Sequence, residues 1–170
     1  MRRQYRFQSL LTLAGWALLS GCSWFSSAPE IPPQQRQIVM QLNAAPIINP
    51  GPNGRAQPVK ICIIETNLDG WSPPDLYQGT PCAAINTGGE VVSVSQYILA
   101  PLETRQYLRE VPFDQDRWLV IAAEFQNMNE GKNLMQLKSV ARTDFKPVVR
   151  VDGSNLTLLP NPATDVSKEE

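Results

Sequence analysis

Apolar and polar residues alternate along several short stretches of this chain, with the period of two that is typical of a β-strand with one buried face. The stretch at residues 38–45 is the clearest example, because Ile38 and Met40 alternate with polar or smaller residues. Residues 59–65 are β-branched and mostly apolar, which indicates a central strand. Residues 117–125 are almost continuously apolar, which indicates a strand buried on both faces. The other predicted strands cover residues 91–99, 105–111, 134–140, 148–151 and 156–159.

Turn-forming residues separate these strands, since the chain has 15 prolines and 10 glycines. Asp152-Gly153, between the last two predicted strands, suits a two-residue hairpin turn. Residues 73–78 predict a single helical turn with proline near its start. Seven to eight short strands with little helix predict an all-β, two-sheet sandwich over residues 38–162, although the pattern does not determine the strand order.

The amino terminus has the pattern of a secretory signal peptide over residues 1–21. Three arginines precede an apolar segment at residues 10–19, which is too short to cross a bilayer. The sequence Leu-Ser-Gly-Cys that ends at Cys22 resembles the lipobox of bacterial lipoproteins. This resemblance implies a diacylglyceryl thioether on Cys22, cleavage before it and acylation of the new amino terminus. The alternative is an ordinary signal peptide that leaves Cys22 as a free thiol.

The residues after Cys22 bear on where the protein resides. In enterobacterial-type sorting, aspartate at the next position retains a lipoprotein in the inner membrane, so Ser23 favours the periplasmic face of the outer membrane. Residues 22–37, rich in Ser, Pro and Gln, predict the lipidated cysteine and a flexible tether. Residues 163–170 predict a disordered acidic tail.

Charge and cysteine content narrow the classes of function. Removing residues 1–21 leaves 12 of the 15 basic residues against 16 acidic ones, a net charge of −4, which argues against nucleic acid as a partner. Cys62 and Cys82 remain, and in the oxidising periplasm such a pair predicts a disulfide. A redox or metal site, or a free buried Cys62, is the alternative.

No catalytic site is evident in the sequence. The chain has no histidine, which removes the commonest general base and metal ligand, and it lacks nucleophile-elbow, dinucleotide-binding and phosphate-loop motifs. Asp114 and Asp116 are the nearest candidates for an acid–base pair, but they fit a solvated turn better. We therefore expect no catalytic residue, no metal ligand and no cofactor beyond the acyl groups on Cys22.

One predicted loop differs from the others. Residues 46–58 contain four prolines and two glycines between the first two strands, where a simple hairpin needs only two to five residues. A long loop stiffened by proline loses less entropy when a partner binds. Arg55, near its centre, offers a bidentate fork for a carboxylate. Ile47 and Ile48 fit either core anchors or partner contacts, and the first is favoured.

These residues resemble the TssJ family, the outer-membrane lipoproteins of the type VI secretion system. The resemblance depends on Asn49-Pro50, Asn53-Gly54-Arg55 and Pro58-Val59, followed by LAPLETR at 99–105 and RWLVIAAEFQNMN at 117–129. It covers roughly residues 38–160 together with the lipobox. The 66–90 region departs from the family pattern, and the Cys62/Cys82 pair is not typical of the family.

The resemblance implies a transthyretin-like sandwich that binds the periplasmic domain of the inner-membrane protein TssM and, through it, TssL. The family's first loop takes part in that contact. In this chain the implied contact residues are Ile48, Asn49, Pro50, Asn53, Gly54 and Arg55. A pilotin-like or other envelope-assembly lipoprotein, or one that binds a small ligand or peptidoglycan, is the alternative function.

Overall fold

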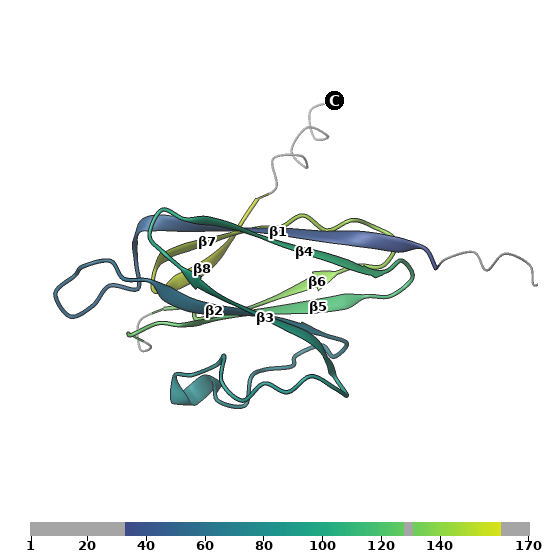
Figure 1. The fold of residues 1–170 in the computed structure, drawn as a ribbon, viewed down its shortest axis with the longest axis horizontal. Coiled ribbons are helices and arrows are strands. Elements are labelled where there is room, and N and C mark those ends of the chain that lie inside the picture. The colour runs from purple at the N-terminus through teal and green to yellow at the C-terminus, as the bar shows by residue number, and fades with distance from the viewer. Residues whose placement is uncertain (1–32, 128–130, 161–170) are drawn as a thin grey trace, which may run out of the picture. The chain divides into compact units, whose positions relative to one another are not determined.

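The computed structural model describes residues 33–127 and 131–160, which form a sandwich of two four-stranded sheets (Figure 1). The first sheet has the strand order β4-β1-β7-β8, and the second has the order β3-β2-β5-β6. The strands are β1 (Gln35–Ile48), β2 (Val59–Thr66), β3 (Val91–Leu99), β4 (Thr104–Pro112), β5 (Arg117–Glu124), β6 (Leu134–Ser139), β7 (Val148–Gly153) and β8 (Asn155–Leu159). The all-β fold class and all eight predicted strands are confirmed.

β1 is longer at both ends than its apolar pattern predicted. It pairs with β4 from Gln35↔Pro112 to Asn43↔Thr104, and it runs parallel to β7. Residues 35–37 were predicted to belong to the tether, and this is wrong. Glutamine and arginine carry no apolar signal there, and the hydrogen bonds of the neighbouring strand extend β1 through them.

The main core lies between the two sheets and consists of the inward residues of all eight strands. A smaller cluster lies on the outer face of the second sheet, where Cys62, Ile64, Val120 and Ala122 are buried. The segment at residues 67–90 covers that face (Figure 1). This cover explains why β2 and β5 are continuously apolar, because each strand is buried on both faces.

A disulfide joins Cys62 on β2 to Cys82 in the covering segment, with 5.5 Å between the two Cα atoms. The helical turn predicted at 73–78 is a 3₁₀ helix, η1 (Leu76–Gln78). The turn between β7 and β8 is the expected tight hairpin, with Gly153 at φ +57°. Within residues 33–127 and 131–160, no helix has the length and apolar character needed to cross a membrane.

The predictions that concern the signal peptide, Cys22, the first part of the tether and the acidic tail lie outside the described residues. They therefore stay predictions.

Candidate docking site

The segment that connects β1 to β2, residues 49–58, projects past the strands at one end of the sandwich (Figure 1). Short hydrogen-bonded turns fix its conformation. The Gly51 amide donates to the Arg55 carbonyl at 3.0 Å, and the Gly54 amide donates to the Gly51 carbonyl at 2.9 Å. Asn53 Oδ1 accepts a bond from the Arg55 amide at 3.1 Å, and Gly54 supplies φ +72°. We call residues 49–58 the projecting loop.

Asn49, the first residue of the projecting loop, fixes the loop to the sandwich through three hydrogen bonds. Its amide donates to the Gly153 carbonyl at 2.7 Å, and its Nδ2 donates to the Pro58 carbonyl at 2.8 Å. Its Oδ1 accepts a bond from the Gln126 amide at 2.7 Å. Asn49 has φ +46°, a conformation that asparagine tolerates better than most residues. One buried side chain thus ties together both ends of the loop and the start of the β5–β6 connection.

The structure divides the six predicted contact residues into two groups. Ile48 is fully buried in the main core, and Asn49 is only 4% exposed, so neither is available to a partner in this conformation. Pro50 is half-buried, and Asn53, Gly54 and Arg55 are exposed. Ile47, which was expected to be a core anchor, is instead 56% exposed, because β1 turns Ile48 inward and Ile47 outward.

Arg55 is the only charged residue of the projecting loop. Among the residues that the structure describes, no carboxylate forms an ion pair with its guanidinium, whereas eight other basic side chains do have such a partner. The loop therefore presents an unpaired positive charge with five donors in a planar fork.

A shallow groove of about 300 Å³ lies beside the loop, lined by Pro50, Gly51, Pro52, Gln126 and Asn127. The Gln126 side chain donates a hydrogen bond to Gln57 Oε1 in the loop. The sequence did not identify Gln126 and Asn127 as site residues, because they follow β5 and are 69 or more positions from Gln57. Only the fold brings the β5–β6 connection beside the loop.

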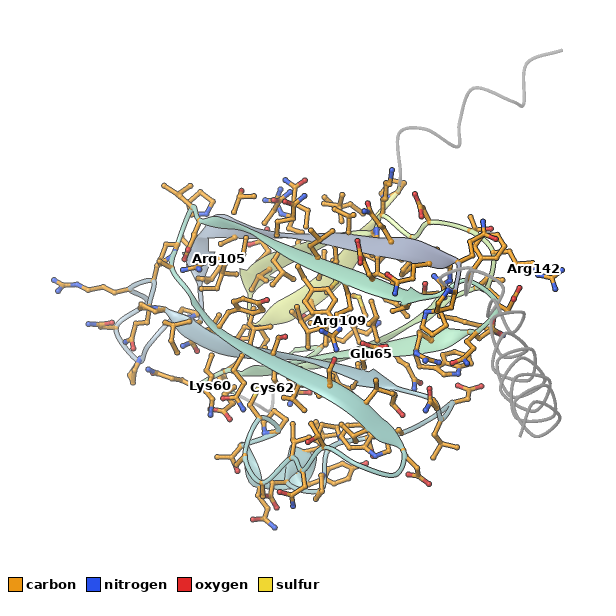
Figure 2. The ribbon with its side chains drawn as sticks, turned by 45° about the vertical axis from the view of Figure 1, so that its right-hand side comes forward. Lys60, Cys62, Glu65, Arg105, Arg109 and Arg142 are labelled. Atoms are coloured by element: carbon orange, nitrogen blue, oxygen red, sulfur yellow. A yellow bond between two sulfur atoms is a disulfide. The ribbon has the colours of Figure 1, made fainter. Side chains whose placement is uncertain are left out.

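The opposite end of the sandwich holds a buried ion cluster. Glu65 is 2% exposed, and its carboxylate accepts bonds from Arg117 Nε at 2.9 Å, Arg109 Nε at 3.2 Å and Ser93 Oγ at 3.1 Å (Figure 2). Arg36 lies nearby and donates from Nη1 to Ser139 Oγ at 2.6 Å. Burial lowers the pKa of the Arg36 guanidinium, and the neighbouring Arg117 charge lowers it further. Both carboxylate oxygens of Glu65 accept hydrogen bonds, which offsets the cost of burying its charge.

Asp114 and Asp116 do not form an acid–base pair. Asp116 accepts a bond from the Ala141 amide at 2.7 Å and forms an ion pair with Lys138 at 2.9 Å. The bond from Lys138 lowers the pKa of Asp116. Asp114 pairs with Arg142 at the surface, 3.2 Å away. Within the described residues, no group of three or more Cys, Asp or Glu side chains is placed to hold a metal ion.

A second groove, of about 410 Å³, lies in the segment that covers the second sheet. It is lined in part by Trp71, Pro74, Ile85 and Val91. The exposed Tyr77 belongs to the same segment. The disulfide holds this segment on the sheet, and the Cys82 amide also donates to Glu124 Oε1 at 3.2 Å.

The fold and the site together define a class: a small all-β sandwich with a hydrogen-bonded, exposed loop at one end. The chain belongs to the family described as "Type VI secretion lipoprotein, VasD, EvfM, TssJ, VC_A0113", whose sequence model matches residues 36–154. This confirms the resemblance that the loop residues indicated.

Solved structures share the fold. TssJ1 from Pseudomonas aeruginosa has a TM-score of 0.60 and 21% identity, over 77% of this chain and 98% of that one. Lip of Serratia marcescens, described as a membrane-bound component of the type VI secretion system, has a TM-score of 0.58 and 15% identity, over 73% and 97% of the two chains.

A chain of the structure titled "T6SS protein TssM C-terminal domain (869-1107) from EAEC" matches with a TM-score of 0.53 and 17% identity, over 74% of this chain and 99% of that one. No curated protein sequence matches this chain.

Proposed function

We propose that this protein is the outer-membrane lipoprotein of the type VI secretion membrane complex and that it anchors TssM through the projecting loop. The observation that carries the proposal is the loop itself: it is fixed at its base by Asn49 and exposes the unpaired Arg55 at its surface. Family membership supports the secretion role. Structures titled for TssM and for the "Type VI membrane complex" contain chains of the same fold, which supports this choice of partner.

The proposed contact has three parts. Arg55 binds a carboxylate of TssM, Asn53 and Gly54 place their backbone against it, and Pro50 lines the groove that receives an adjoining apolar side chain. Because the loop is already ordered by its own hydrogen bonds, binding costs little conformational entropy. Ile48 and Asn49 support the contact from beneath it.

The proposed membrane attachment is through acyl groups on Cys22, with Ser23 favouring the outer membrane. One acyl chain binds a membrane only reversibly, whereas three contribute enough buried methylene groups for lasting attachment. Twelve residues separate Cys22 from the start of β1 at Gln35, enough chain to span roughly 40 Å when extended.

β1 connects the two attachment points. Its first residue follows the tether, and its last residue leads into the projecting loop, so a pull between the membranes acts along this strand. β1 lies inside its sheet, with β4 on one side and β7 on the other. Backbone hydrogen bonds on both sides of β1 then share the load. The function proposed is therefore mechanical, and it requires no catalytic step.

The test is recovery of TssM from membranes with the tagged full chain. Arg55→Ala is expected to reduce the recovered TssM at least about tenfold, because hydrogen-bonded charge pairs at interfaces are worth roughly 2 kcal/mol or more. Arg142→Ala is the matched control, since Arg142 is an exposed arginine at the opposite end of the domain (Figure 2). Equal recovery with both variants would exclude the loop as the contact. Recovery of a secretin in place of TssM would support a pilotin instead.

A further inference from the structure

Residues 67–90, which cover the outer face of the second sheet (Figure 1), are the acidic part of the described domain. They contain Asp69, Asp75 and Glu90 and neither lysine nor arginine. Seven of the eleven carboxylate side chains in residues 33–127 and 131–160 form ion pairs, whereas these three form none with any described residue. The covering segment therefore presents uncompensated negative charge.

The groove of about 410 Å³ lies in this covering segment. Trp71 and Pro74 line it from the first half of the segment, and Ile85 and Glu90 line it from the second half. Trp71 also packs against the buried cluster beneath it, whereas Glu90 is exposed. A partly buried indole ring and a carboxylate without an ion-pair partner among the described residues thus line the same groove.

Hydrogen bonds and the disulfide hold both halves of the covering segment in place. Gln96 Nε2 on β3 donates to the Cys82 carbonyl at 3.0 Å, next to the disulfide that joins Cys82 to β2. The Asn67 amide donates to the Glu90 carbonyl at 3.0 Å, which ties the start of the segment to its end. Because the groove is formed before a ligand binds, binding costs little conformational entropy.

The lining fits the side chain of an arginine. Its planar guanidinium stacks on an aromatic ring and bonds a carboxylate, and its methylene groups pack against apolar side chains. Trp71, Glu90 and Ile85 supply these three kinds of contact. Glu90 repels an anionic ligand, and a neutral apolar ligand makes no use of its charge. Asp69 and Asp75, on the same segment, favour a ligand with several positive charges over a single cation.

We propose that this groove binds a basic segment of another protein and that one arginine of the segment lies between Trp71 and Glu90. The groove is lined by the covering segment and by Val91, the first residue of β3, so it uses no residue of the projecting loop. The proposal is therefore independent of the contact with TssM and of the acyl groups on Cys22.

The experiment measures the fluorescence anisotropy of a labelled synthetic peptide of alternating arginine and glycine, titrated with the purified full chain in nonionic detergent. Saturable binding is expected, and it should weaken as salt is added. A peptide with citrulline in place of arginine has nearly the same shape without the charge, and it is expected to bind at least about tenfold more weakly. Lack of saturable binding by the arginine peptide, or equal binding of both peptides, would overturn the proposal.

Two variants locate the contact. Glu90→Gln and Trp71→Leu are each expected to raise the dissociation constant of the arginine peptide at least about fivefold. Glu90→Gln breaks no ion pair among the described residues, so its result counts even where Trp71→Leu loosens the covering segment. Circular dichroism checks the fold of each variant.

Glu110→Gln is the matched control, because Glu110 is also exposed and forms no ion pair with a described residue, but it lies on β4. Both glutamine variants change the net charge of the chain equally. The control is expected to change the dissociation constant less than about twofold. Equal weakening by Glu90→Gln and Glu110→Gln would mean a general electrostatic attraction, and the groove would then not be the binding site.

Discussion

At the scale of single residues, Asn49 belongs to a recognised sequence motif, but its observed hydrogen bonds are internal to the domain. The motif Asn49-Pro50 was identified as part of a contact surface, but Asn49 is buried and makes three hydrogen bonds inside the domain. Its neighbours in space, Gly153 and Gln126, are distant in the sequence. In this chain Asn49 therefore fixes the projecting loop from inside the domain, whereas Arg55 is exposed.

Replacing Asn49 with alanine tests this role. Asn49→Ala leaves the Pro58 carbonyl and the Gln126 amide without their partners and puts alanine, which tolerates the left-handed region less well than asparagine, at φ +46°, so the free energy of unfolding is expected to fall by about 3 kcal/mol. Urea denaturation measures the loss. Asn53→Ala is the control, because Asn53 is exposed and makes one local bond, and it is expected to cost less than about 1 kcal/mol. Similar losses for both variants would contradict the role given to Asn49.

At the scale of elements, the segment at residues 67–90 buries the outer face of the second sheet, so that this sheet is covered on both faces. A sandwich sheet normally has one wet face, but here the cover buries Ile64, Val120 and Ala122 on the outer side. The cover has little regular structure, only the short η1 helix, and it buries few apolar side chains of its own. We therefore expect the disulfide between Cys62 and Cys82 to contribute much of the free energy that keeps residues 67–90 on the sheet.

Removing the disulfide tests whether it holds residues 67–90 on the sheet. The double variant C62A/C82A is expected to lose about 3 kcal/mol of stability, since the cross-link closes a loop of 20 residues. Hydrogen exchange should rise over residues 67–90 and stay slow in β1 and β7, whose contacts do not involve the cover. A reducing agent should destabilise the wild type by the same amount and leave the double variant unchanged. Uniform acceleration of exchange through both sheets would show that the disulfide supports the whole sandwich.

At the scale of the molecule, the projecting loop and the buried ion cluster around Glu65 lie at opposite ends of β2. The projecting loop follows the end of β1, and Glu65, at the centre of the buried cluster, is the next-to-last residue of β2. Arg36, the second residue of β1, is fixed by Ser139 and by the carbonyls of Gln115 and Thr143. The first residues of β1 are therefore held to the domain by several side-chain hydrogen bonds. In the proposed function, the load from the membrane would enter the domain at this end of β1.

The membrane attachment is tested at this scale too. A full chain carrying Cys22→Ala is expected to move from the membrane fraction to the soluble periplasmic fraction, because this variant cannot carry the proposed thioether-linked acyl groups. Fractionation with an immunoblot measures the shift. The protein should keep its disulfide and its β-sheet circular dichroism spectrum, since Cys22 lies outside the described sandwich. Continued sedimentation of this variant with outer membrane would contradict attachment through Cys22.

The alternation of apolar residues and the proline and glycine turns were enough to predict seven to eight strands and an all-β sandwich, and the pair Cys62/Cys82 predicted the disulfide. The reason is physical: strand periodicity and turn chemistry are local properties of the chain. The sequence alone also located the projecting loop and identified the family. Its predictions for residues 1–32 concern processing signals and remain expectations.

Only the tertiary structure decided which residues of the loop face solvent. Burial depends on what packs from elsewhere in the chain, so Ile48 and Asn49 could not be separated from Arg55 by pattern. The same holds for residues 35–37, which join β1 through bonds to β4, and for Gln126, which lies beside Gln57 only in the folded chain.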